Sequence, residues 1–157
     1  MTTQRDKVLK RAINVLAYKM RTVKEMSDKL TEKCDDEEIV NDVLFELCQK
    51  KLLDDLHYAT LYIQDGINLK QKGRFRIQTE LIAKGVDKKV IQQAFEASEV
   101  NEVDVLLKYI ESYTYGKTFE SYKDIEKLKA HLYRKGYSIG DINEAVRESG
   151  ITCRRDY

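Results

Sequence analysis

The sequence predicts an all-α protein in which three tandem three-helix repeats form an elongated, curved array. Three observations carry this prediction. Apolar residues recur three and four positions apart, as they do along amphipathic helices. The chain has no proline, which suits uninterrupted helices and argues against a loop-rich β architecture. A pattern of apolar residues also returns at a constant offset of 51 residues. A three-helix unit of about fifty residues buries too little surface to be stable alone, so we expect the repeats to pack on their neighbours.

Apolar positions that align at this offset form most of the predicted core. The aligned sets are Met26, Ile77 and Leu128; Leu30, Leu81 and Leu132; Val40, Ile91 and Ile142; Val43, Ala94 and Ala145; and Leu44, Phe95 and Val146. The helical spacing adds Val8, Ala12, Leu16, Ala59, Ile63, Ile67, Leu106 and Ile110.

Residues that begin and end helices repeat in the same phase. Two sets suit helix N-caps, namely Thr22, Gly73 and Asp124, and Asp36, Asp87 and Ser138. Gly85 and Gly136 follow the second helix of their repeats, where a residue with positive φ commonly ends a helix. Cys34 holds that position in the first repeat, so we expect its turn to be built differently.

These signals divide the chain into three repeats and a tail. Repeat 1 (1–52) is predicted to hold helices at 6–20, 23–33 and 37–50. Repeat 2 (53–100) is predicted to hold helices at 55–71, 74–84 and 88–98. Repeat 3 (101–150) is predicted to hold helices at 102–114, 124–135 and 139–148, and residues 151–157 form a C-terminal tail.

Composition narrows the class of protein. With 35% charged and 42% hydrophobic residues, the chain is predicted to be globular. It has no apolar run long enough for a membrane span and opens on polar residues, so we expect neither an integral membrane protein nor a conventionally secreted one. Cys34, Cys48 and Cys153 form no CxxC pair, which argues against a disulfide framework or a zinc site and favours a reduced cytoplasm.

The net charge of +1 conceals three blocks of one sign. Residues 5–21 carry six basic side chains against one acid, residues 35–55 carry eight acids against two lysines, and residues 70–89 carry seven basic side chains against two acids. Each block is either a solvated helix face or a surface for a charged partner. Within the acidic block, the stretch 35–46 either faces a basic partner or repels nucleic acid, unless residues 36–38 are simply first-turn acids that suit the helix dipole.

Candidate catalytic residues are few. The Asp54-Asp55 pair is consistent with acid–base chemistry or a cation site, but it directly precedes an amphipathic run, so we favour helix capping. His131 has no Ser, Cys or Asp arrangement around it in sequence and is expected at a contact between helices. The sequence has no Gly-rich phosphate loop and no HExxH motif. We therefore expect no catalytic residues, no metal site and no cofactor.

Two groups of residues are candidates for contact with a partner. Basic side chains crowd the turn before residue 76, with Phe75 among them; Phe75 either stacks on a base or packs in a core, and we favour the core. Arg76 is also spaced to pair with Glu80 along a helix. Six tyrosines form either a contact surface or a core edge, and we favour the core: Tyr109, Tyr113, Tyr115, Tyr122, Tyr133 and Tyr137.

The spacing of motifs across residues 8–148 resembles the bacterial RecX family. In the middle of the chain the matching motifs are Leu53-Asp54-Asp55, Tyr58-Ala59, Tyr62-Ile63, Lys72-Gly73, Arg76-Ile77, Glu80-Leu81, Lys84-Gly85-Val86, Ile91 and Ala94. Upstream they are Ala12, Leu16, Arg21-Thr22, Glu25-Met26, Lys29-Leu30 and Ile39. The chain departs from the family pattern at Lys51 and Cys34, where glycines are common, and these departures affect turns more than chemistry.

The resemblance implies a non-enzymatic, all-helical regulator that binds in the groove of a RecA filament on DNA. Such proteins limit filament growth and reduce ATP hydrolysis, strand exchange and the co-protease function that triggers the SOS response. We expect a cytoplasmic monomer. Its basic residues expected to meet DNA phosphates or an acidic recombinase surface are Lys70, Lys72, Arg74, Arg76, Lys84, Lys88, Lys89, Arg134 and Lys135.

Two other hypotheses remain open at this point. A DNA-binding module that acts without recombinase would lose affinity steeply with salt. A helical scaffold for some other protein would neither bind DNA nor affect a recombinase.

Overall fold

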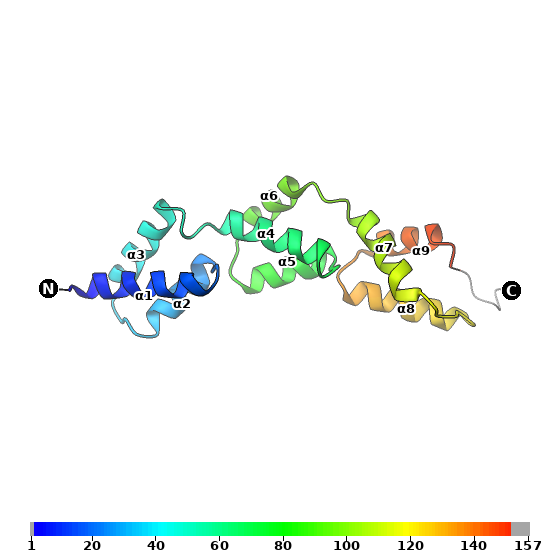
Figure 1. Cartoon of the computed structure of the whole chain (residues 1–157), viewed down its shortest axis with the longest axis horizontal. Coiled ribbons are helices and arrows are strands. Elements are labelled where there is room, and N and C mark those ends of the chain that lie inside the picture. Colours follow the sequence, from blue (N-terminus) through cyan, green and yellow to red (C-terminus); the bar gives the residue numbers. More distant parts are fainter. Residues whose placement is uncertain (1, 152–157) are drawn as a thin grey trace. The chain divides into compact units, whose positions relative to one another are not determined.

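The structure is a computed structural model that describes residues 2–151. Over this range the chain forms nine α-helices and no strand, so the predicted all-α class is confirmed (Figure 1). The helices are α1 (Gln4–Tyr18), α2 (Val23–Thr31), α3 (Glu37–Gln49), α4 (Asp55–Asn68), α5 (Arg74–Ala83), α6 (Lys88–Ser98), α7 (Glu102–Thr114), α8 (Tyr122–Arg134) and α9 (Ile139–Glu148). The tail residues 152–157, which include Cys153, lie outside the described range.

Helix starts follow the predicted phase. The helices α3, α6 and α9 begin at Glu37, Lys88 and Ile139, which keeps the offset of 51 residues. Their N-caps are the expected ones: the side chains of Asp36, Asp87 and Ser138 each accept a hydrogen bond from an amide of the first turn.

Two helix starts differ from the prediction because of capping boxes. Thr3 and Asp6 cap each other's backbone amides, so α1 begins at Gln4 rather than at residue 6. It ends at Tyr18 rather than at residue 20, because Lys19 is extended. In the third repeat Asp124 is not the N-cap. Ser121 holds that position, and the Asp124 carboxylate accepts from the Ser121 amide at 3.3 Å as the third residue of the helix. The acid is therefore a capping residue, but α8 begins at Tyr122 rather than at residue 124.

The glycines after α5 and α8 adopt the positive φ expected of them, +89° at Gly85 and +107° at Gly136. The corresponding turn of the first repeat, after α2, is built differently, as predicted: Cys34 is 4% exposed and has no positive φ. Lys51 has a φ of +60°, although it is not a glycine. Position 51 thus keeps the backbone conformation that a glycine favours and carries a lysine in it.

The chain divides into two compact units, Met1–Leu61 with Leu81–Ala97, and Tyr62–Glu80 with Ser98–Tyr157. In the first unit α1 and α2 pack on α3 around a core that includes Met26, Leu30, Val43 and Leu47. In the second unit α7 and α8 pack on α9 around Leu106, Ile110, Leu128 and Leu132, among others. The predicted core residues are buried, except Leu16, which is only partly buried. Within residues 2–151 every helix is too short or too polar to cross a bilayer.

Candidate functional site

The Asp54-Asp55 pair caps helices. Asp54 Oδ1 accepts from the His57 amide at 3.1 Å and so caps α4, as predicted. Asp55 Oδ1 accepts from the Val23 amide at 3.0 Å, so it caps the start of α2, a helix distant in sequence. Burial raises the pKa of the Asp55 carboxyl group, and the hydrogen bond from Val23 opposes that shift. Both carboxylates are thus occupied by backbone amides.

In the first unit the start of α2 packs against the turn after α5, and we call this contact between Thr22, Lys24, Lys84 and Gly85 a joint. Thr22 is fully buried, and its hydroxyl donates to the carbonyl of Lys84 at 2.6 Å while accepting from the Glu25 amide at 3.1 Å. A Cβ added to Gly85 would lie 2.4 Å from the side chain of Lys24. The turn after α5 is therefore seated directly against the first turn of α2.

The second unit holds the equivalent joint, 51 residues further along. Gly73 takes the place of Thr22, and its amide donates to the carbonyl of Lys135, the counterpart of Lys84, at 2.8 Å. The Phe75 amide donates to the carbonyl of Gly136 at 3.1 Å, and the Tyr137 hydroxyl donates to the carbonyl of Gln71 at 2.8 Å. The turn after α8 is thus held against the start of α5 mainly by backbone groups.

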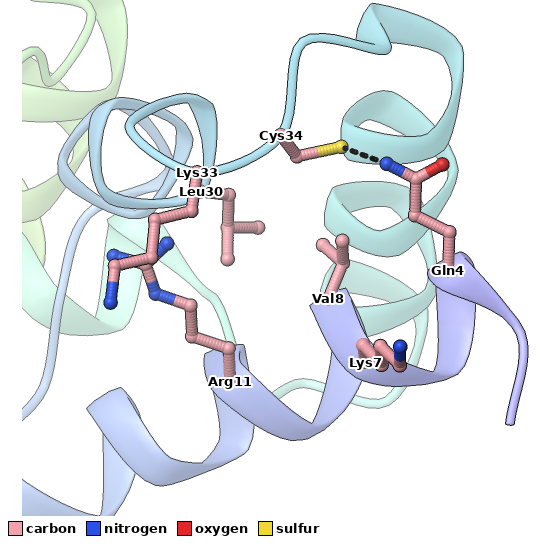
Figure 2. A pocket seen from close by; sticks show the side chains of 7 residues that line it. All are labelled: Gln4, Lys7, Val8, Arg11, Leu30, Lys33 and Cys34. Atoms are coloured by element: carbon pink, nitrogen blue, oxygen red, sulfur yellow. Dashed lines mark hydrogen bonds between the residues drawn. The ribbon is translucent and has the colours of Figure 1, made fainter.

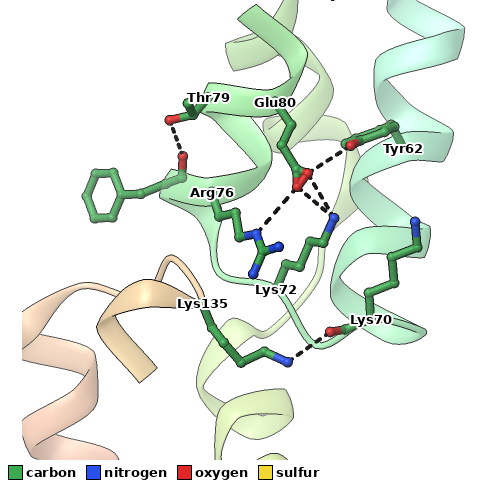
Figure 3. A network of polar contacts seen from close by, with 8 residues as sticks. Tyr62, Lys70, Lys72, Arg76, Thr79, Glu80 and Lys135 are labelled. Carbon is green, nitrogen blue, oxygen red and sulfur yellow. Dashed lines mark hydrogen bonds and ion pairs between the residues drawn. The ribbon is translucent and has the colours of Figure 1, made fainter. Parts of the chain in front are cut away.

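Two of the predicted contact residues, Lys72 and Arg76, surround one carboxylate beside this joint. The Lys72 ammonium lies 2.6 and 2.8 Å from the two oxygens of Glu80, the Tyr62 hydroxyl donates at 2.9 Å, and Arg76 Nε lies 3.6 Å away (Figure 3). The predicted Arg76–Glu80 pair is confirmed. Burial raises the pKa of Glu80, but the hydrogen bonds from Lys72 and Tyr62 and the two cations outweigh it, so the pKa is lowered.

Lys135 and Lys70 contact each other across the same joint. The Lys135 ammonium donates to the carbonyl of Lys70 at 3.2 Å (Figure 3). The same ammonium lies 4.1 Å from the centre of the Tyr109 ring. Burial and the charges of Arg76 and Lys72 lower the pKa of Lys135. Lys135 and Lys72 therefore have internal partners, whereas Lys70 is an exposed residue.

The remaining predicted cations lie on exposed or partly exposed positions. Arg74 pairs with Glu102 at 3.3 Å, and half of the Arg74 side chain is exposed. Burial raises the pKa of Glu102, although the charge of Arg74 acts to lower it. Arg134 is exposed at the end of α8. Lys88 and Lys89 are exposed on the first turn of α6, and Lys84 is partly buried; these three belong to the first compact unit. The structure thus brings Lys70, Lys72, Arg76 and Lys135 together, with Arg74 and Arg134 in the same unit.

The expectation that Phe75 packs in a core is wrong, because 55% of its surface is exposed. It lies on α5 beside a hollow that also contacts Tyr133 and Ile139, which are 60% and 64% exposed. The tyrosines of the third repeat divide in the same way. Tyr137 is buried, as expected, but Tyr115, Tyr122 and Tyr133 are exposed. Helical spacing does not separate these tyrosines, because Tyr115 and Tyr137 lie in turns outside the helices, where apolar periodicity carries no information.

His131 lies at a contact between helices, as predicted. It stacks on Tyr113 with ring centroids 4.3 Å apart, and its Nε2 is 2.6 Å from the Tyr109 hydroxyl. Burial lowers the pKa of His131, and the charges of Lys135, Arg134 and Lys117 lower it further. The ring is therefore a neutral packing element near pH 7.

A separate hollow of about 530 Å³ lies in the first unit, between α1 and the turn after α2 (Figure 2). The basic side chains of Lys7, Arg11 and Lys33 line it, together with the buried Leu30. Gln4 and Cys34 also line it, and the side-chain amide nitrogen of Gln4 lies 3.7 Å from Cys34 Sγ. Part of the N-terminal basic block predicted from the sequence thus borders a hollow.

Within residues 2–151 no group of three His, Cys, Asp or Glu side chains is placed to hold a metal ion. Cys34 and Cys48 are free thiols, and burial raises the pKa of Cys48. The fold and these residues define a helical-repeat protein with exposed cations and exposed aromatic side chains.

Comparison with known proteins shows the family to which this helical-repeat protein is related. Residues 9–47 match the model of the first three-helix domain of RecX, and residues 54–94 match that of the second. The chain is 34% identical to the regulatory protein RecX of Oceanobacillus iheyensis over 142 residues, which cover 89% of this chain and 52% of that protein. It is also 34% identical to the RecX of Finegoldia magna over 131 residues, covering 81% of this chain and 64% of the relative.

Solved structures agree with this relationship. The crystal structure of RecX from Lactobacillus salivarius superposes with a TM-score of 0.77 at 27% identity, covering 94% of this chain and 97% of that one. A crystal structure titled regulatory protein RecX gives a TM-score of 0.76 at 28% identity, covering 92% and 73%. The chain belongs to the RecX family. It spans about half of the length of the relative from Oceanobacillus iheyensis and a little under two thirds of the relative from Finegoldia magna. Both relatives are named as regulatory proteins.

Proposed function

We propose that this protein binds RecA filaments on DNA and inhibits the recombinase, ATPase and co-protease activities of RecA, and thereby regulates DNA repair and the SOS response. Membership of the RecX family is the observation that carries the proposal. The protein would act as a cytoplasmic monomer without catalysis or cofactor, with residues 1–52, 53–100 and 101–150 as its three repeats and 151–157 as a tail.

Tandem repeats suit a polymeric partner. Residues at equivalent positions recur along this chain, just as equivalent surfaces recur along a filament of identical subunits. A molecule bound to two adjacent subunits would block incoming duplex DNA or hold the ATP-bearing interface out of its active geometry. Either effect would extend over many subunits if filament growth stops at the bound molecule.

The basic residues have two roles in this proposal. Arg74, Arg76, Arg134, Lys70, Lys84, Lys88 and Lys89 would contact DNA phosphates or acidic recombinase residues directly. Lys72 and Lys135 would support that surface, because their ammonium groups hold Glu80 and the carbonyl of Lys70.

The test is DNA-dependent ATP hydrolysis by the cognate RecA, with this protein titrated from far below stoichiometric amounts. Inhibition at low ratios is expected, because one bound molecule acts on many subunits. Folded protein that leaves hydrolysis unchanged at every ratio would rule the proposal out.

The contact residues are tested by Arg134→Glu together with Lys88→Glu, which should weaken inhibition with little change in melting temperature. Glutamate at 74 or 76 is a poorer test, since it would face Glu102 or Glu80. Direct DNA binding without recombinase is the second candidate, supported by the exposed cations. In that case affinity for a labelled duplex would fall steeply with salt in the absence of RecA.

A further inference from the structure

A hollow of about 630 Å³ lies beside the joint of the second unit, between α5 and the turn from α8 to α9. Phe75, Tyr133 and Ile139 border it and are each more than half exposed. Large apolar side chains normally avoid water, so three of them around one hollow mark a surface that a partner covers.

The walls of this hollow are held in place before any partner binds. The amide of Phe75 donates to the carbonyl of Gly136, and the Thr79 hydroxyl donates to the carbonyl of Phe75 at 2.9 Å. Tyr137 is buried beneath, with its hydroxyl on the carbonyl of Gln71. A site whose backbone is already ordered loses little entropy on binding, which favours affinity.

The charged residues that line the hollow favour an anionic partner. Arg76 and Arg134 line the hollow with two cations, and the one lining acid, Glu80, is paired at 2.6 Å with Lys72 as well as with Arg76, so the group of these four residues carries a net positive charge. Arginine and aromatic residues around an apolar centre are also the composition that recurs at the energetic centres of protein interfaces.

We propose that this hollow receives one apolar side chain, flanked by at least one carboxylate, from the partner recombinase. The inference rests on the proposed function and names the contact that the second unit makes. The rings of Phe75 and Tyr133 would also suit a stacked base, but Ile139 adds an exposed aliphatic side chain to the lining, and an apolar side chain of a protein would cover it as well as the rings.

The test compares Phe75→Ala and Ile139→Glu with wild type in the RecA ATPase titration. Both positions are exposed, so both variants should fold and melt like wild type. Ile139 is also the first residue of α9, where a carboxylate is favoured by the helix dipole, yet Glu there would repel the partner's carboxylate. Each variant should need about ten-fold more protein for half-maximal inhibition. The matched control is Tyr115→Ala, an aromatic residue of the same unit that is 89% exposed and does not line the hollow, and it should inhibit like wild type.

The outcomes separate this inference from the proposed function. If wild type does not inhibit, the proposed function fails. If wild type inhibits and both variants inhibit equally well, the hollow is not the contact and this inference is overturned. Fluorescence anisotropy with labelled oligothymidine gives a third reading. If Phe75→Ala loses oligothymidine binding while inhibition is unchanged, the hollow binds DNA bases and the inference is again overturned.

Discussion

Gly73 and Gly136 meet backbone to backbone. A Cβ added to Gly73 would lie 2.3 Å from the carbonyl carbon of Gly136, and one added to Gly136 would lie 2.5 Å from Cβ of Arg76. Neither distance is compatible with a side chain, so the joint requires glycine at both positions. Because the obstructing atoms belong to the backbone or to the first carbon of a side chain, they have little room to move aside.

Replacing Gly136 with alanine should therefore destabilise the second unit. Its φ of +107° disfavours any L side chain, and the steric overlap adds to that strain. We expect a loss of about 3 kcal/mol in the free energy of unfolding, measured by urea denaturation.

Two other glycines serve as controls for this substitution. Gly116 also has a positive φ, +75°, but a Cβ there would meet no atom within 4 Å, so Gly116→Ala should cost only about 1 kcal/mol. Gly140 lies in α9 with open space around it, and Gly140→Ala should be neutral or slightly stabilising. Equal losses at 136 and 116 would show that steric contact at the joint contributes nothing.

The equivalent joint in the first unit depends on the hydroxyl of Thr22. Thr22→Val keeps the shape of the buried side chain but removes the hydroxyl that binds the carbonyl of Lys84 and the amide of Glu25. We expect a loss of about 2 to 3 kcal/mol by urea denaturation. Thr22→Ser, which keeps the hydroxyl, should cost about 1 kcal/mol or less, and a Val variant as stable as the Ser variant would contradict this role.

Glu80 should make the protein sensitive to acid. Its pKa in the folded chain lies below the ordinary value of 4.5, so the unfolded chain binds more protons between these two values. The stabilisation is therefore complete above the ordinary pKa and is lost as the pH falls through the folded pKa. Glu80→Gln should be less stable at neutral pH by about 1 kcal/mol and should lose less stability on acidification.

The measurement for Glu80 is the urea midpoint between about pH 3 and pH 6. The control is Glu111→Gln, on the exposed side of α7, which should follow the wild-type profile. If the Glu80→Gln and wild-type profiles run parallel, then Lys72, Arg76 and Tyr62 do not stabilise the Glu80 carboxylate.

His131 should produce a second pH dependence with a slope of the same sign. Its pKa in the folded chain is below the ordinary value of 6.5, so between these values the unfolded chain binds more protons and stability rises with pH. Within this window the slope is at most about 1.4 kcal/mol per pH unit. Melting temperatures of wild type and His131→Gln between about pH 5 and pH 7.5 test this, and a wild-type slope that survives the substitution would assign it to another group.

The sequence was sufficient for the helices because the signals that place them are local. Apolar periodicity and N-caps such as Asp36 and Ser138 act within one or two turns. The offset of 51 residues also aligns Thr22 with Gly73 and Lys84 with Lys135, the residues whose contacts form the two joints. The error at α8 arose because an acid at the third position of a capping box and an acid at the N-cap look alike in sequence.

The surface was harder to predict because its chemistry depends on contacts distant in sequence. Lys72 was grouped with the outward-facing cations, but the fold places both oxygens of Glu80 against its ammonium. Phe75 was expected inside because aromatic residues are usually buried. Its position on α5 is instead beside a turn that comes from α8, and no local signal in the sequence predicts that approach.

The two joints differ in whether mutation can change the strength of their contacts by small steps. At position 22 the contact passes through a hydroxyl, so Ser keeps the hydroxyl and loses a methyl group, Val loses the hydroxyl, and Ala loses both. At position 73 the backbone itself makes the contact, so every replacement adds an atom where there is no room. Natural or laboratory selection can therefore tune the first joint gradually, whereas at position 73 the second joint can only be kept or broken.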